Sequence, residues 1–117
     1  MSTTTIRLAA LALLGLLGAC TINPHPMDMT QAVQTAKTAS EHEALARHYE
    51  DAAKDMRAKA NEHKKMLAYY EARKDLIRKH AQDLISHCQG LIRIYEQAAN
   101  ENLSMAKSHH ELAAEAK

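Results

Sequence analysis

The sequence predicts an all-α protein: a long antiparallel helical hairpin whose two arms are copies of one unit. First, the pattern Leu-x-Arg-x-Tyr-Glu-x-Ala-Ala begins at Leu45 and recurs at Leu91, 46 residues later. Second, apolar residues recur every three or four positions around each copy, as on one face of an α-helix. Third, both prolines, Pro24 and Pro26, precede this region, so no proline interrupts a helix after them.

Further identities support a duplication. At the same spacing of 46 residues the sequence pairs Ser40 with Ser86, Ala60 with Ala106, His63 with His109, and Ala68 with Ala114. Two alanine-rich helices match partly through composition, but the nine-residue pattern is more specific than composition. Each copy of a repeat is usually one supersecondary unit that buries its face on its neighbour. We therefore expect the two copies to pack against each other.

The first residues have the features of a targeting segment. A polar stretch with one cation, residues 1–7, is followed by an apolar run at 8–17 and then by small residues. The apolar run is shorter than the roughly 20 residues that span a bilayer. Segments of this kind are removed from the mature protein.

The end of this segment, Leu17-Gly18-Ala19-Cys20, resembles the lipobox of bacterial lipoprotein precursors. The resemblance implies that residues 1–19 are a cleaved signal peptide and that lipid is attached to Cys20. The alternative is an ordinary secretory signal in which this cysteine is incidental.

A lipidated Cys20 implies a body held at a membrane surface, because two or more acyl chains give stable anchoring. Residues 20–28 then form a proline-containing tether. Thr21 stands where enteric inner-membrane lipoproteins carry Asp, which favours the outer membrane, facing the periplasm. Removal of Arg7 leaves 14 of the 15 basic residues against 14 acidic ones. A neutral chain without Phe or Trp lacks the basic stripe and stacking platforms of nucleic-acid binders.

The helical domain, residues 29–117, divides into arms at about 29–70 and 75–116, with a polar turn at 71–74. Asp28 is placed to cap the first arm and Asp75 the second. Ser40 and Ser86 each begin a capping-box pattern, Ser-x-x-Glu and Ser-x-x-Gln. Breaks at these two serines would instead give a bundle of two short and two long helices.

The apolar positions define the interface, or seam, between the arms. Its predicted side chains are Leu45, Tyr49, Met56, Leu67, Leu84, Leu91 and Tyr95. The second arm carries more isoleucine and leucine than one narrow seam needs, including Ile85, Ile92 and Ile94. We therefore expect homo-oligomerisation into a four-helix assembly, or docking on another envelope protein.

The chain is rich in histidine, with eight in 117 residues. Imidazole and thiolate ligands suit copper or zinc, which gives a candidate metal site: Cys88, His63, His87 and His109. Otherwise we expect no cofactor. The competing interpretation is that seam histidines fix the register of the helices. A hairpin turning at Arg73 would place His63 opposite Asp83 and Cys88 near Ala58, so the ligands would not converge.

No catalytic signature is present: the sequence lacks a Gly-rich phosphate loop, a haem-attachment box and an H-E-x-x-H helix. We therefore expect a non-enzymatic periplasmic scaffold or accessory subunit, with a periplasmic copper-binding protein as the alternative. A second alternative follows from a resemblance to murein lipoprotein, a short lipidated helix whose C-terminal lysine is joined to peptidoglycan. It implies cell-wall attachment through Lys117, although a hairpin returns that residue toward the membrane end.

Overall fold

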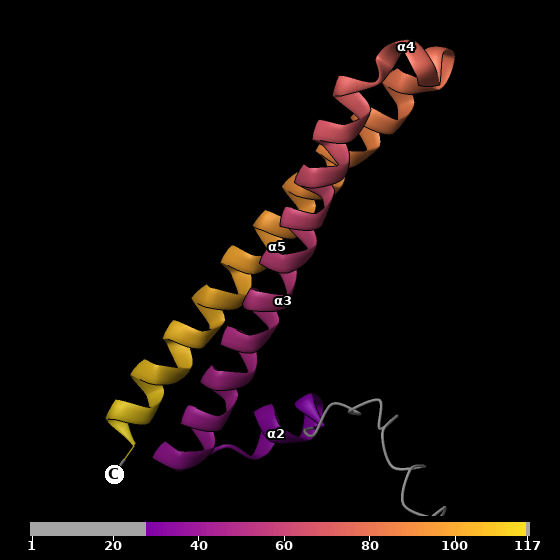
Figure 1. Ribbon diagram of the computed structural model, residues 1–117. Coiled ribbons are helices and arrows are strands. Elements are labelled where there is room, and N and C mark those ends of the chain that lie inside the picture. Colours follow the sequence, from indigo (N-terminus) through magenta and orange to yellow (C-terminus); the bar gives the residue numbers. More distant parts are fainter. Residues whose placement is uncertain (1–27, 117) are drawn as a thin grey trace, which may run out of the picture.

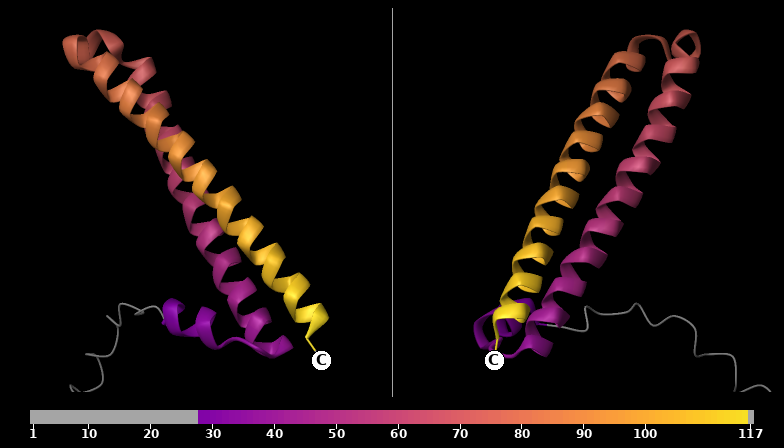
Figure 2. Two further views of the ribbon diagram at one scale, coloured as in Figure 1. Left: turned by 180° about the vertical axis from the view of Figure 1, so that it is seen from behind. Right: turned by 90° about the vertical axis from the view of Figure 1, so that its left-hand side faces the viewer.

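The computed structural model describes residues 28–116, and within this range the chain is helical, without a strand. In chain order the elements are α2 (Met29–Thr35), α3 (Ala39–Ala72), α4 (Lys74–Ile77), the 3₁₀ turn η1 (Arg78–His80) and α5 (Ala81–Glu115). The long helices α3 and α5 run antiparallel, side by side, and cross at a shallow angle (Figures 1 and 2). The predicted antiparallel helical hairpin is therefore confirmed. The leader, Cys20 and Lys117 lie outside the described residues.

The first arm is shorter than predicted, because the chain leaves the helix at residues 36–38. Asp28 caps the short α2 as expected, accepting hydrogen bonds from the backbone N–H groups of Thr30 and Gln31. This helix lies beside the N-terminal end of α3, and none of its own side chains is buried (Figure 1). The predicted arm at 29–70 is thus two helices, of which only α3 packs along α5.

The start of α3 is set by a capping box two residues before the predicted one. Thr38 Oγ1 accepts from the Glu41 N–H at 3.2 Å, and Glu41 Oε2 accepts from the N–H groups of Lys37 and Thr38 at 2.8 and 2.9 Å. These backbone hydrogen bonds, Lys37 first, lower the pKa of Glu41. Two overlapping patterns compete here, and Thr38 rather than Ser40 takes the cap. No break occurs at Ser86, which lies inside the continuous α5.

The centre of the hairpin is packed by small side chains. Ala53, Ala60 and Ala99 are 1% exposed and Ala106 is 2% exposed. Ala60 and Ala99 also line one shallow hollow between α3 and α5. Alanine lets the two backbones approach closely, so the seam is narrow. Within residues 28–116 the largest side chains with less than 2% exposure are Leu45 and Cys88.

The other predicted seam residues are half-buried rather than buried: Tyr49, Met56, Leu67, Leu84, Leu91 and Tyr95. The reason is geometric. A pair of helices covers only the strip where they touch, and residues beside that strip keep part of their surface in water. Thus Ala53 and Ala99 are buried, whereas the preceding residues Ala52 and Ala98 lie at the edge of the strip.

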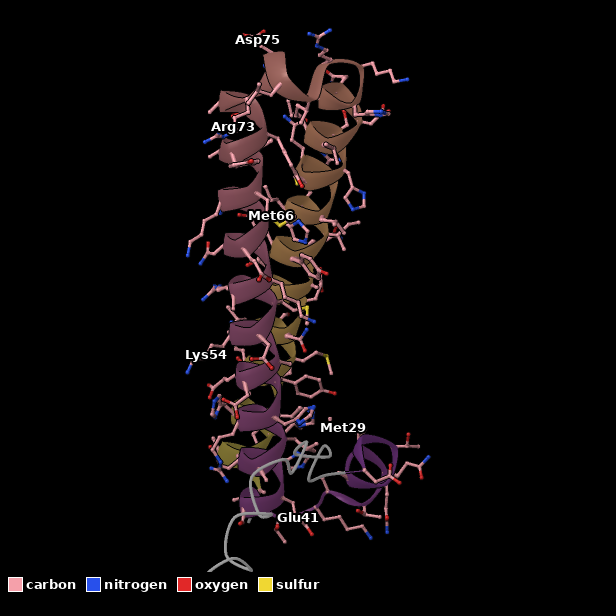
Figure 3. The ribbon with its side chains drawn as sticks, turned by 45° about the vertical axis from the view of Figure 1, so that its right-hand side comes forward. Met29, Glu41, Lys54, Met66, Arg73 and Asp75 are labelled. Atoms are coloured by element: carbon pink, nitrogen blue, oxygen red, sulfur yellow. The ribbon has the colours of Figure 1, made fainter. Side chains whose placement is uncertain are left out.

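The connection at the closed end is longer than the predicted turn at 71–74. After Ala72 the chain forms α4 and η1 before α5 begins at Ala81, with Arg73 and Asp75 at the tip (Figure 3). Asp75 lies inside α4 and does not cap α5, whose N-terminus has no side-chain cap. Arg78 has φ 47° and ψ −118°, a backbone conformation that favours glycine. The polar composition predicted the region of the turn but not its length.

No helix in the described part of the chain combines the length and the hydropathy required to cross a membrane.

Candidate functional site: a histidine cluster at the open end

The open end of the hairpin, where α3 begins and α5 ends, carries a cluster of aromatic and ionisable side chains that joins the two helices. We call it the open-end cluster; its members are His42, Glu43, Tyr49, Glu50, His109 and His110. The first four lie on α3, and the two histidines at 109 and 110 lie on α5. Neighbouring positions on α5 place the two rings on different sides of the seam, so each one contacts α3 differently.

His109 lies between two rings of α3. Its Nδ1 is 3.2 Å from Nδ1 of His42, and these two rings stack with centroids 5.4 Å apart. On its other side the ring of Tyr49 stacks at 5.6 Å with an interplanar angle of 8°. The imidazole of His109 is 7% exposed and is the one polar side chain in the core of the described residues.

His110 faces outward and bridges two carboxylates of α3. Its Nδ1 is 3.1 Å from Oε1 of Glu43, and its Nε2 is 2.8 Å from Oε1 of Glu50. The two glutamates are seven residues apart, two turns of the helix, so the imidazole lies between successive turns of one face. This places one α5 side chain against two points of α3.

The two neighbouring histidines have opposite pKa shifts. Burial lowers the pKa of His109, and the nearby charge of His42 lowers it further. Hydrogen bonds to Glu50, and then to Glu43, raise the pKa of His110. The buried ring therefore favours the neutral form, whereas the outer ring favours the imidazolium form.

A related arrangement occurs toward the closed end, and it follows the sequence repeat. The ring of His63 stacks on Tyr95 at 5.7 Å, as His109 stacks on Tyr49, with each pair joining opposite copies of the repeat. Lys64 binds Glu96 at 2.6 Å, at the positions equivalent to His110 and Glu50. The hairpin therefore has an approximate internal two-fold symmetry in its contacts as well as in its sequence.

The two copies differ chemically. Lysine at 64 replaces the histidine at 110, and Cys88 occupies the position equivalent to His42. Cys88 is a free, buried thiol. Toward the closed end Nδ1 of His63 is buried without a hydrogen-bond partner, whereas Nδ1 of His109 at the open end is paired. Among the described residues, a pair of imidazoles joins the helices only at the open end, whereas toward the closed end His63 contacts α5 through its ring stack on Tyr95.

The structure does not bring the four predicted metal ligands together. His63 and His109 contact the tyrosines of opposite copies, at different levels of the hairpin. Across residues 28–116 no three histidine, cysteine or acidic side chains are close enough to hold a metal ion. His87 is exposed on α5. The predicted register was also wrong, because His63 lies against Tyr95 and not opposite Asp83: the connection extends to residue 80.

Sequence reasoning found His109 and Tyr49 but missed the other members of the open-end cluster, His42, Glu43, Glu50 and His110. The repeat contained a usable signal, since a histidine follows the tyrosine by 14 residues in both copies. In an antiparallel pair of copies, each tyrosine can then face the histidine of the other. That reasoning required the correct register, which depended on the unrecognised helical connection.

These contacts define a class of fold: an internally symmetric two-helix hairpin with an alanine seam and an imidazole-rich open end. No protein family model, curated protein or solved structure matches this chain.

Proposed function

We propose that this chain is a non-enzymatic, lipid-anchored scaffold or accessory protein of the bacterial cell envelope, and that it works as a homo-oligomer. The membrane anchor and the outer-membrane, periplasm-facing location rest on the lipobox that ends at Cys20. The oligomer rests on an exposed apolar face of α5, which is the observation that carries the proposal. We name it the outer face of α5.

Three large side chains make the outer face of α5: Ile94, Met105 and Leu112, which are 60%, 43% and 42% exposed. At 100° per residue their positions fall within about 20° of one another, so they lie along one line of the helix. That line is about a quarter to two fifths of a turn away from the buried alanines of the seam. The hairpin therefore leaves a second apolar surface on the same helix uncovered.

The outer face is specific to one copy of the repeat. The equivalent positions of α3 are His48, Lys59 and Met66, so only one of the three is apolar. A second hairpin laid against α5 would cover the line and complete four helices, whereas α3 presents a charged exterior. Pairing through identical faces gives a closed two-fold assembly.

A charge placed on the outer face tests this proposal. In the full chain purified in detergent, Ile94→Lys is expected to shift the sedimentation behaviour from dimer toward monomer, because an ammonium group would be buried between hairpins. Leu76→Lys is the matched control, since Leu76 is 73% exposed and lies in α4 at the closed end. It should leave the oligomer intact.

Two outcomes would contradict the proposed homo-oligomer. One is a monomeric wild-type chain at micromolar concentration. The other is a dimer that Ile94→Lys and Leu76→Lys affect equally. If the wild-type chain is monomeric but recovers one defined envelope protein from detergent extracts, with Ile94→Lys abolishing the recovery, the face serves a different partner and the self-association is wrong.

A further inference from the structure

The distances in the open-end cluster fix where its protons must be. A carboxylate only accepts hydrogen bonds, so His110 can bond to Glu43 and Glu50 together only with both ring nitrogens protonated, as imidazolium. A hydrogen bond between the Nδ1 atoms of His42 and His109 needs one proton shared between two nitrogens. One of these two rings must therefore present an unprotonated Nδ1.

These two requirements oppose each other as pH changes. When both Nδ1 atoms carry a proton, the hydrogen bond between them is replaced by repulsion between two cations. Alkalinisation removes a proton from His110, and a neutral imidazole has a single N–H, so one of its two carboxylate contacts is lost. All the contacts coexist only in an intermediate range of pH.

We propose that the open-end cluster is a pH-gated clasp, which holds the ends of α3 and α5 together near pH 6–7 and loosens in both more acidic and more alkaline solution. This inference concerns the contacts between α3 and α5 of one hairpin and does not depend on the proposed oligomer.

Other titratable side chains surround the clasp, and the carboxylate of Glu41 interacts electrostatically with His42. The ionisable side chains near it on the two long helices include Glu41, His42, Glu43, His48, Tyr49, Glu50, Lys107, His109, His110 and Glu111. His48 lies edge-on against the ring of Tyr49, and Lys107 lies 3.8 Å from Glu111 of its own helix. The neighbouring α2 has no ionisable side chain.

The directions of the two pKa shifts agree with a loss of stability in both acidic and alkaline solution, which we call the acidic and alkaline limbs of the pH profile. Folding raises the pKa of His110, so its contribution is complete below the unfolded value of about 6.5 and is lost as pH rises through the folded pKa. Folding lowers the pKa of His109, so its contribution is complete above about 6.5 and is lost as pH falls through the folded pKa. Together the two shifts make the contribution of the clasp to stability largest near the unfolded histidine pKa of about 6.5.

The equivalent contact toward the closed end indicates how the clasp could be made insensitive to alkaline pH. Lys64 forms the equivalent bridge to Glu96, and a lysine stays protonated up to a pKa of about 10.4. The substitution His110→Lys would therefore keep the contact with Glu50 through the range in which histidine loses its charge. For this reason His110→Lys is the variant that tests the alkaline side of the clasp.

The test uses the full chain in detergent and measures the melting temperature by circular dichroism between about pH 5 and about pH 9. The wild type is expected to melt highest near pH 6–7 and several degrees lower at both extremes. His110→Lys should flatten the alkaline limb and keep the acidic one. His42→Gln should reduce the fall in melting temperature on the acidic side without abolishing it, because burial alone also lowers the pKa of His109. His87→Gln, which changes an exposed histidine of α5 outside the clasp, should retain both limbs.

A second measurement on the unmodified chain keeps the proposal testable if a variant fails to fold. Nitrogen-15 NMR of the histidine rings at about pH 6.5 should show His110 protonated at both nitrogens. It should show one unprotonated Nδ1 in the pair formed by His42 and His109. A neutral His110, two imidazolium rings at 42 and 109, or a melting temperature that does not change with pH would overturn the clasp.

Discussion

Replacing Leu45 by alanine is expected to destabilise the hairpin by about 2–5 kcal/mol, the range for truncating a buried leucine. Leu45 has no exposed surface, and it is one of only two large side chains buried to this degree in residues 28–116. Alanines fill most of the remaining seam and offer little area to compensate. A fall in melting temperature of roughly 10 °C or more should be visible by far-ultraviolet circular dichroism.

The matched control is Leu112→Ala in the same background. Leu112 is 42% exposed and lies on the outer face of α5, so the same chemical change removes much less buried surface. Its melting temperature, measured at a concentration where the chain is monomeric, should stay close to that of the wild type. Equal losses for the two leucines would show that Leu45 does not lie in the core.

Enlarging Ala60 to leucine is the second change with a large expected effect, about 1–3 kcal/mol of destabilisation. Ala60 is 1% exposed in the seam with α5, and a branched side chain that extends beyond the shallow hollow it lines with Ala99 would press on α5. The added methyl groups would push the helices apart and weaken contacts on both sides. Urea denaturation gives the free energy of unfolding directly.

Two further alanine-to-leucine variants serve as comparisons, one at an exposed position and one at the buried position equivalent to Ala60 in the repeat. Ala68→Leu makes the same substitution at an exposed position of α3 and should alter stability by less than about 0.5 kcal/mol. Ala106→Leu changes the repeat counterpart of Ala60, which is 2% exposed, and should cost about as much as Ala60→Leu. A stable Ala60→Leu variant would mean that the helices are not closely packed at this level.

The long helices could be predicted from sequence because their signals are local. The stripe that starts at Leu45, the absence of proline after Pro26 and the repeat at Leu91 all act within one helix or between identical copies. The boundaries were less predictable where two local signals competed, as at Thr38 and Ser40. Both residues begin a capping-box pattern, and only the geometry of the chain decides between them.

The open-end cluster could not be predicted because it depends on register, which is set by the connection. No glycine or proline marks the chain between Ala72 and Ala81, and Arg78 adopts a conformation that arginine rarely adopts. A sequence pattern therefore gave a turn several residues too early. That error displaced every cross-helix pair, so His63 was assigned to Asp83 instead of Tyr95. The leader and Lys117, outside the described residues, remain predictions.

The central claim is that the two copies fold back on each other in one symmetric register. Proton–proton NOE measurements on the full chain, with its tyrosine and histidine rings labelled, test this most directly. The hairpin predicts cross-peaks between the rings of Tyr49 and His109 and between those of Tyr95 and His63, within single chains. Cross-peaks that place His63 against Asp83, or that arise only between chains in a mixed-label sample, would contradict it.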